Sequence, residues 1–312
     1  MKKLSIVLAS WCAFSSAPAL AWDSFGHMEV AAVAWSKLTP KARARVADLL
    51  KVNPNYDILT KDASPDNRDQ IAFVVAATWP DLIKFEIHGY TADGPEKGDR
   101  PPPGPEASQN VGYSDHFMHK YWHFVDTPFS TDGTALIQPG IPNAQTQIAL
   151  FRAALSSNAS DDIKSYDLVW LEHLVGDMHQ PLHATSRFTQ ARPQGDAGGN
   201  EVKIDCGGCS ATELHAFWDD VLGTSDKPQD AIQAASNLPA APAALAAVAD
   251  GKVWIKESFD AAKANAYSNP IGPGLGPFSL TAGYKSTAQT IANQRVALAG
   301  ARLANLLNAA FK

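Results

Sequence analysis

The chain has 312 residues, of which 45% are hydrophobic, and its formal net charge at pH 7 is −6. This length suffices for one large domain or two smaller ones. The acidic balance and the lack of any Lys/Arg-rich run argue against binding along a nucleic-acid duplex through a basic surface. After residue 21, no stretch of the sequence is long and apolar enough to span a membrane.

The first 21 residues have the form of a signal peptide. Lysines at positions 2 and 3 precede an apolar stretch at 4–14, and residues 19–21 read ALA, an A-x-A cleavage site. We therefore expect an exported protein, periplasmic or secreted, whose mature chain begins at Trp22 and carries roughly −8 without the two lysines. The new α-amino group titrates near pH 8, so it can be deprotonated cheaply and bind a metal.

The start of the mature chain predicts two helices. Apolar positions recur at helical spacing over residues 23–38, which places His27 in the first turn. A second helix is predicted over residues 40–52, where Thr39 and Pro40 form a reasonable N-cap and first residue.

A third helical pattern at 67–77 runs into the sequence TWPD, which ends at Asp81. Asp81 therefore falls where a helix must bend or restart, a common place for a ligand. Residues 91–110 are rich in proline, glycine and polar residues, which predicts a loop or lid. The sequence does not show whether this loop covers a site.

The following segment, HFMHKYWHFVD, contains three histidines. His116, His119 and His123 are spaced at i, i+3 and i+7, which would align them on one face of a helix. If the segment is extended instead, its aromatic residues favour a short strand or a close approach to the core. The spacing alone does not say which histidine is a ligand.

Two further helices are predicted over residues 143–156 and 167–178, and the second runs into WLEHLVGDMHQPLH. His173 and Asp177 are four residues apart, so they project from one face of that helix. A Gln-Pro pair then disturbs the helix, and His183 follows the break. Imidazoles and a carboxylate at a helix end are what a divalent metal such as zinc needs. The alternative is a core helix with hydrogen-bonded histidines.

Residues 201–204 alternate in polarity and predict a small hairpin that ends at Cys206 and Cys209. In an oxidising compartment, this pair is expected to form a short-loop disulfide that pins a turn. A zinc knuckle would need a second C-x-x-C, which the sequence does not contain. A redox-active pair is the other alternative, but no βαβ pattern surrounds it.

A second His-x-x-x-Asp pair follows the cysteines. Residues 212–219 resume a helical pattern in which His215 and Asp219 are again four residues apart. With His183 between the two pairs, these residues would serve more than one metal, since one zinc usually takes three or four protein ligands. Asp177 is central enough to be a bridging carboxylate.

Two later stretches are predicted to be helical. Residues 226–249 are rich in alanine and proline, and residues 289–311 form a long amphipathic pattern expected to close the core. We therefore expect one mainly α-helical domain over residues 22–312.

Several motifs occur in order: Trp22 with His27, TWPD, WHFVD, HLVGDMHQPLH, GGN and LHAFWD. This set resembles the zinc-dependent nucleases called S-one and P-one, with their 3′-nucleotidase relatives, and covers the mature chain from Trp22 to about residue 220. The resemblance implies a mainly α fold, a single helical domain with a trinuclear zinc cleft, to which the expected short β-hairpin is added.

The resemblance also implies nine metal ligands. The first zinc would be held by Asp81, His123, His173 and Asp177, and the second by His183, His215 and Asp219. The third would take the α-amino nitrogen and carbonyl oxygen of Trp22, His27 and again Asp177. The other histidines are expected on the surface or behind the ligands; they are His88, His116, His119 and His179.

The implied activity is that of an endonuclease that cleaves single-stranded RNA and DNA to 5′-phosphate products and also acts as a 3′-nucleotidase. A hydroxide bridging the first two zincs would attack phosphorus in line. Asp81, as a ligand of the first zinc, and Lys84, beside the phosphate, would act in catalysis. The alternative for Lys84 is a solvated surface lysine.

Three positions are matched to substrate contacts. Phe124 can stack against any base, for which roughly 1–3 kcal/mol is typical, and Asp126 can accept hydrogen bonds from the base. The alternative for Phe124 is core packing. Asp220 follows the last ligand where some family members carry asparagine, and it is matched to a contact with phosphate or base in which it departs from those members. Residues 207–211 supply no aromatic for the opposite wall of the base pocket.

The expected partners are single-stranded nucleic acid and 3′-nucleotides as substrates, with no stable protein partner and no membrane. The nearest rival is a trizinc phospholipase C, whose relatives use glutamate as the last ligand and space the N-terminal tryptophan further from its histidine. A non-catalytic zinc-binding protein of the periplasm is a second rival, although such proteins tend to carry His-rich loops. A metallopeptidase is disfavoured because no H-E-x-x-H occurs.

Overall fold

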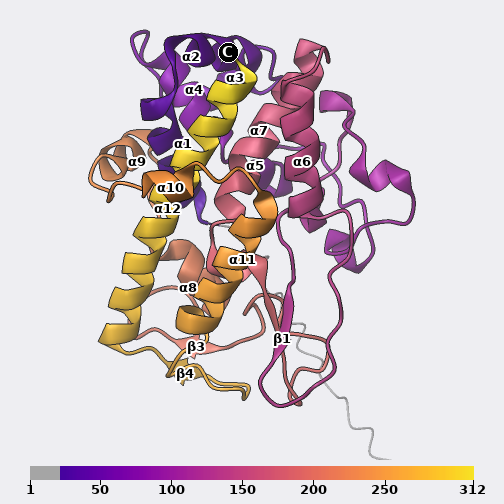
Figure 1. Ribbon diagram of the computed structural model, residues 1–312, viewed down its shortest axis with the longest axis vertical. Coiled ribbons are helices and arrows are strands. Elements are labelled where there is room, and N and C mark those ends of the chain that lie inside the picture. The colour runs from indigo at the N-terminus through magenta and orange to yellow at the C-terminus, as the bar shows by residue number, and fades with distance from the viewer. Residues whose placement is uncertain (1–21) are drawn as a thin grey trace, which may run out of the picture.

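The computed structural model describes residues 22–312, so the expected signal peptide lies outside the described residues. The predicted mainly helical fold is confirmed (Figure 1). The α-helices are α1 (Ser24–Lys37), α2 (Pro40–Leu50), α3 (Tyr56–Leu59), α4 (Arg68–Ala76), α5 (Trp79–Phe85), α6 (Ala144–Leu155), α7 (Asp161–Asp177), α8 (Leu214–Asp220), α9 (Pro228–Ala235), α10 (Ala243–Ala246), α11 (Gly251–Ala261) and α12 (Ala282–Ala310). Within residues 22–312, no helix has the length and apolarity that a membrane crossing requires.

Helix α7 forms the centre of the molecule. All of its residues from Ser165 to Asp177 are buried, because other helices cover it from several sides. It packs against α6, α12, α2, α1 and α5. Figure 1 shows α7 beside α6 in the upper half of the molecule, with α12 along the opposite flank. The polar residues at the C-terminal end of α7 are therefore carried into the interior.

Helix α1 is the second element that brings polar residues inside. It packs against α12, α9, α4 and α7, and its residues from Phe25 to Ala34 are all buried. The chain then turns into α2 as predicted: Pro40 occupies the first turn, and the Thr39 side chain accepts a hydrogen bond from the Ala42 amide at 3.2 Å.

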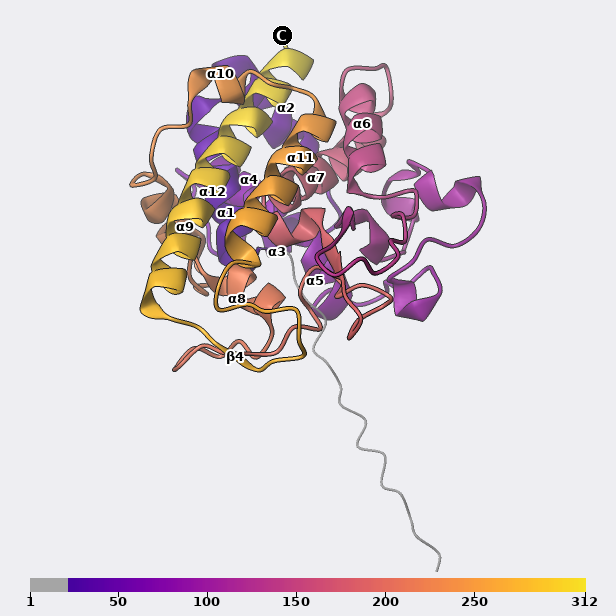
Figure 2. The same cartoon turned by 60° about the horizontal axis from the view of Figure 1, so that its bottom comes forward.

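Short strands pair segments that are distant in sequence. Strand β1 (Pro128–Ser130) is parallel to β2 (Ser186–Phe188), and β3 (Ile204–Asp205) is parallel to β4 (Phe278–Ser279). The expected hairpin at 201–204 is reduced to one antiparallel bridge between Lys203 and Glu213. The alternation of polar and apolar residues at 201–204 does not indicate a strand partner as remote in sequence as β4. Strands β3 and β4 lie together at one end of the molecule (Figures 1 and 2).

Several predicted helix limits were wrong. The helix expected at 167–178 begins at Asp161, because its first turn carries two exposed aspartates and lacks the apolar pattern. The one expected at 289–311 begins at Ala282, and Tyr284 is the one buried residue of its first turn. The single helix expected at 226–249 is divided into α9 and α10. Pro239 and Pro242 lie between these two helices, and a proline lacks the N–H that a helix interior needs. Helix α11 was not predicted.

The loop expected at 91–110 is confirmed as irregular chain with short 3₁₀ turns at Glu96–Gly98 and Pro105–Ser108. Its base is closed by a parallel bridge between Thr91 and Phe117. Neither the helix nor the strand considered for HFMHKYWHFVD forms. His119 adopts a left-handed backbone conformation (φ 42°), and only a 3₁₀ turn at Lys120–Trp122 follows it.

Candidate metal centre

Eight candidate ligand side chains converge from six parts of the chain. They are His27 of α1, Asp81 of α5, His123 after the Lys120–Trp122 turn, His173 and Asp177 of α7, His183 of the Pro181–Ala184 turn, and His215 and Asp219 of α8. All eight are buried. In three sets of three residues the ligand atoms all lie within 4.8 Å of one another: His27, Asp81 and His173; His123, His173 and Asp177; and His183, His215 and Asp219. The structure thus brings together every side-chain ligand that the sequence predicted.

The first group consists of Asp81, His123, His173 and Asp177. The Asp177 Oδ2 atom lies 3.2 Å from His123 Nδ1 and 3.3 Å from His173 Nε2. The Asp81 Oδ1 atom lies 3.7 Å from His173 Nε2 and 3.9 Å from His123 Nδ1. Two imidazoles and two carboxylates therefore face a common point.

The second group consists of His183, His215 and Asp219. The Nε2 atoms of the two histidines are 3.0 Å apart, and His215 Nε2 lies 3.5 Å from Asp219 Oδ2. This group is connected to the first through Asp177, whose Oδ1 atom is 3.9 Å from His183 Nδ1.

The imidazole of His27 also lies beside Asp177. Its Nε2 atom lies 3.4 Å from Asp177 Oδ1, and its ring stacks on that of His173 at 3.8 Å between centroids. Gly176 makes this close approach possible, since a Cβ at that position would lie 2.8 Å from His27 Nδ1. Asp177 therefore has one oxygen facing His123 and His173 and the other facing His27, as a ligand shared by the first and third sites requires.

Trp22 lies beside the same end of α7. It is fully buried, and its indole N–H donates to the Gly176 carbonyl at 3.1 Å. The next residue, Asp23, donates its amide to the Asp219 carbonyl at 3.3 Å. The backbone of Trp22 is thereby held close to the candidate ligands. Its function as an α-amino ligand depends on cleavage after residue 21 and stays a prediction.

Backbone carbonyls fix the tautomers of three of the histidines. His173 Nδ1 is 2.8 Å from the Ala77 carbonyl, His183 Nδ1 is 2.8 Å from the His123 carbonyl, and His215 Nδ1 is 2.7 Å from the Gly198 carbonyl. Because a carbonyl oxygen only accepts hydrogen bonds, each Nδ1 must carry the hydrogen and each Nε2 must present a lone pair. Two such lone pairs meet between His183 and His215, and a shared cation would turn this repulsion into attraction.

Burial sets the protonation of the centre. It lowers the pKa of all five candidate histidines, and that of His215 falls to about 4, so the neutral, metal-binding form is favoured. Burial also raises the pKa of Asp177 and Asp219 well above the ordinary value. Neither oxygen of Asp177 has a hydrogen-bond partner among the residues described. Buried carboxylates without donors are stabilised by a cation.

Lys84 faces the first group rather than solvent, contrary to the alternative of a surface lysine. Its ammonium group is 2.7 Å from Asp81 Oδ1, three residues earlier on α5, and only 6% of its side chain is exposed. Phe124 and Asp126 follow His123 and are half-buried. Burial and the nearby Asp196 carboxylate raise the pKa of Asp126 to about 7.

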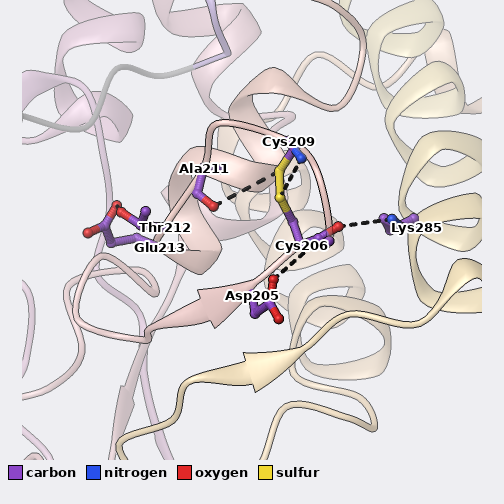
Figure 3. Close-up of a disulfide and its surroundings, with 8 residues drawn as sticks. Asp205, Cys206, Cys209, Ala211, Thr212, Glu213 and Lys285 are labelled. Carbon is purple, nitrogen blue, oxygen red and sulfur yellow. Dashed lines mark hydrogen bonds between the residues drawn. A yellow bond between two sulfur atoms is a disulfide. The ribbon is translucent and has the colours of Figure 1, made fainter.

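Asp220, the third predicted substrate contact, is not part of the three groups. It lines a surface hollow of about 250 Å³ between α8 and α12, together with Phe217 and Lys285. The predicted disulfide between Cys206 and Cys209 is present at the edge of this hollow. Figure 3 shows Lys285 of α12 donating to the Cys206 carbonyl, at 3.0 Å.

The remaining histidines lie outside the groups. His88 and His116 are exposed, as expected. His119 and His179 are buried, which excludes the surface alternative for both and leaves the expected position behind the ligands. His119 lies 2.7 Å from both Asp93 and Asp115, and His179 lies 2.9 Å from Arg302, which explains their burial.

Sequence reasoning missed the groups that support the ligands. The Gln180 side chain donates to Asp219 Oδ1 at 2.6 Å, and it was noted only as part of a helix break. The carbonyls of Ala77, His123 and Gly198 have no side-chain signature at all. For these carbonyls, the only sequence signal was the GGN motif, which marks the turn that contains Gly198.

A family model described as S1/P1 Nuclease matches residues 22–312. Endonuclease 2 of Arabidopsis thaliana is 22% identical over 214 residues, which cover 69% of this chain and 60% of that protein. Endonuclease 3 of the same plant is 30% identical over 178 residues, covering 50% of this chain and 56% of that protein. The chain thus spans less than two thirds of the length of both relatives. From the match across residues 22–312, the chain belongs to the S1/P1 nuclease family.

Proposed function

We propose that this protein is a zinc-dependent endonuclease that hydrolyses phosphodiester bonds in single-stranded RNA and DNA. Its products carry 5′-phosphates, and the same site removes the phosphate from 3′-nucleotides. The observation that carries the proposal is the cluster of buried histidines and aspartates, in which the Nε2 lone pairs of His183 and His215 face each other at 3.0 Å and neither Asp177 oxygen has a hydrogen-bond partner among the described residues. Membership of the S1/P1 nuclease family and the two endonuclease relatives support action on nucleic acids.

The donor set fits zinc. Imidazole nitrogen and carboxylate oxygen are common zinc ligands, and the carbonyl-fixed histidines resemble the supported histidines of zinc sites. Three zincs per chain are proposed. Asp81, His123, His173 and Asp177 would hold one, and His183, His215 and Asp219 a second. His27, Asp177 and the α-amino end of Trp22 would hold the third.

Zinc ions at these positions would neutralise phosphate charge and supply an activated water. The chain itself positions the scissile phosphate. The Lys84 ammonium is fixed by Asp81 at 2.7 Å, so it is oriented before substrate arrives and can donate to a phosphate oxygen beside the first group. Asp177 is fully buried, so it is well placed to act as a fixed bridging ligand rather than to exchange protons with solvent.

Phe124 and Asp126 are proposed to select an unstacked base. Both are half-buried and follow His123 directly, so a base held there would place its phosphate near the first group. A base can stack on the Phe124 ring only after it leaves a duplex, which accounts for a preference for single strands. The net charge of −6 argues against long-range attraction of duplex DNA by the protein surface.

Export to the periplasm or the extracellular space is part of the proposal. The signal-peptide pattern at residues 1–21 supports it, as does the disulfide between Cys206 and Cys209, since disulfides persist in oxidising compartments. Cleavage after residue 21 would also create the free α-amino group of Trp22. Export and metal binding are therefore linked, with residues 22–312 forming the mature domain.

The test is a set of parallel assays on zinc-loaded, correctly processed protein. The substrates are single-stranded RNA, single-stranded DNA, a 3′-mononucleotide and phosphatidylcholine vesicles. We expect hydrolysis of the first three, with 5′-phosphate ends on the fragments, and loss of activity with a chelator. Cleavage of the choline lipid without nucleic-acid hydrolysis would establish a phospholipase instead. Binding of three zincs without any hydrolysis would establish a zinc-binding protein.

A further inference from the structure

We propose that Asp196 is a positioning residue for His215, because its buried carboxylate organises the turn whose Gly198 carbonyl holds the His215 imidazole. This inference rests on the proposed metal-binding function. Neither the motif matches nor the metal groups include Asp196, which lies on no helix or strand. Asp196 would therefore act on the second group through the turn that contains Gly198, and not by direct contact with the candidate ligands.

Asp196 accepts an unusual number of hydrogen bonds for a loop residue. It is fully buried, and its Oδ1 atom accepts from the Arg187 amide at 2.9 Å, the Gly199 amide at 3.2 Å and the Tyr267 hydroxyl at 3.0 Å. Its backbone carbonyl accepts from the amides of Gly199 and Glu201. The carboxylate therefore ties the turn to β2 on one side and to the segment after α11 on the other.

The turn needs this restraint because its backbone is strained. Three successive residues have positive φ: Ala197 (49°), Gly198 (61°) and Gly199 (85°). A side chain at Gly198 would clash with the Leu182 carbonyl, which precedes the ligand His183. Alanine rarely adopts such a conformation unless surrounding contacts hold it there. Asp196 supplies those contacts at the start of the turn.

This turn sets the orientation of the His215 imidazole. The Gly198 carbonyl is 2.7 Å from His215 Nδ1, and the His215 amide donates to the Gly199 carbonyl at 3.4 Å. With Nδ1 held by a carbonyl, Nε2 must point toward His183 and Asp219, at 3.0 and 3.5 Å. If the turn relaxes, the imidazole can rotate or change tautomer, and the second group loses a preoriented ligand.

Arg187 and Tyr267 hold Asp196 in place. The buried Arg187 side chain has its Nε atom 3.6 Å from Asp196 Oδ2, and its guanidinium lies 4.5 Å from the centroid of the Tyr267 ring. Tyr267 belongs to the C-terminal third of the chain, so distant segments meet at this carboxylate. Replacing Tyr267 by phenylalanine removes one of the three donors to Oδ1 and leaves the other two.

The experiment measures zinc affinity in Asp196→Ala, Asp196→Asn and Tyr267→Phe by competition with a colorimetric chelator. In Asp196→Ala, one of the three zincs should bind roughly 10–100-fold more weakly, the range typical of a lost partner behind a ligand. Asp196→Asn keeps an acceptor and should retain most of the affinity, and Tyr267→Phe should lose only a few-fold. The matched control is Asp205→Ala, which removes a carboxylate that caps the neighbouring disulfide turn at Gly207 (Figure 3). That control should leave all three affinities unchanged.

A spectroscopic readout separates positioning from a general loss of stability. In zinc-loaded protein with ¹⁵N-labelled histidine, His215 should show a protected Nδ1–H, and Asp196→Ala should lose it. An Asp196→Ala protein that binds all three zincs as the wild type does and keeps the His215 Nδ1 proton would overturn the inference. If Asp196→Ala does not fold, unchanged zinc affinity in Tyr267→Phe would overturn it equally. Because these readouts follow zinc, a wild type that binds three zincs without hydrolysing nucleic acid would refute the proposed nuclease function alone.

Discussion

Replacing Asp177 by asparagine should affect the stability of the metal-free and zinc-loaded proteins in opposite directions. The Asp177 carboxylate is fully buried and faces four imidazoles, and neither oxygen has a hydrogen-bond partner in the described structure. Without metal, such a carboxylate costs the folded state about 1–3 kcal/mol relative to a well-matched neutral group. Asparagine has nearly the same shape and no charge. The metal-free variant should therefore unfold roughly 2–6 °C higher than the wild type.

With saturating zinc the sign should reverse. At a zinc concentration about 1,000 times the dissociation constant, each bound zinc stabilises the fold by roughly 4 kcal/mol. Asp177 has an oxygen near the first group and another near His27, so asparagine should weaken one or two zinc sites. Zinc should then raise the unfolding temperature of the variant by roughly 8–16 °C less than that of the wild type, at about 2 °C per kcal/mol. After the metal-free gain of roughly 2–6 °C, the zinc-loaded variant should unfold roughly 2–14 °C below the zinc-loaded wild type.

Calorimetry with chelator and with zinc, at mildly alkaline pH, measures both differences. The matched control is Asp167→Asn, a second buried aspartate of α7, which hydrogen-bonds Asn110 at 2.6 Å and belongs to none of the metal groups. Its unfolding temperature should rise with zinc as much as that of the wild type. A metal-free Asp177→Asn protein that is less stable than wild type, or one that keeps the full stabilisation by zinc, would refute the reasoning.

Three further predictions concern substrate and metal. Lys84→Met should lower kcat/KM on single-stranded RNA by about 10–100-fold, equivalent to about 1.5–3 kcal/mol for a charged hydrogen bond, without loss of zinc; an unchanged kcat/KM would contradict the contact. Burial and the Asp196 charge raise the pKa of Asp126 to about 7, so its carboxyl group can donate a hydrogen bond below that pH and only accept one above it. The KM should therefore inflect near pH 7 in the wild type and not in Asp126→Asn. Residues added before Trp22 should remove one zinc and most activity, and an extended protein with three zincs would exclude the α-amino ligand.

The convergence of the candidate ligand side chains could be predicted because their spacing is a local property of helices. His173 with Asp177, and His215 with Asp219, are four residues apart and lie on one face wherever the segment is helical, as it is in α7 and α8. The order of motifs then related His27 and Asp81 to these pairs. The groups that hydrogen-bond the candidate ligands could not be predicted in this way. Every residue has a backbone carbonyl, so the sequence does not reveal that the one of Gly198 contacts His215.

Predictions were wrong where structure depends on distant partners. The spacing of His116, His119 and His123 suits a helix, but His119 is held by Asp93 and Asp115 from the preceding loop and takes a left-handed conformation instead. These contacts exist only once the loop closes at its base. The strands β1 to β4 are similarly too short to be stable alone and form only because each meets a remote parallel partner.

The central claim, a nuclease whose activity depends on three zincs, is tested most directly by one titration. Zinc is added in steps to metal-free protein processed at Trp22, while hydrolysis of single-stranded RNA and bound zinc per chain are followed together. We predict no hydrolysis without zinc and full activity only as the third zinc binds. Full activity without zinc, or saturation with a single zinc bound, would contradict the account.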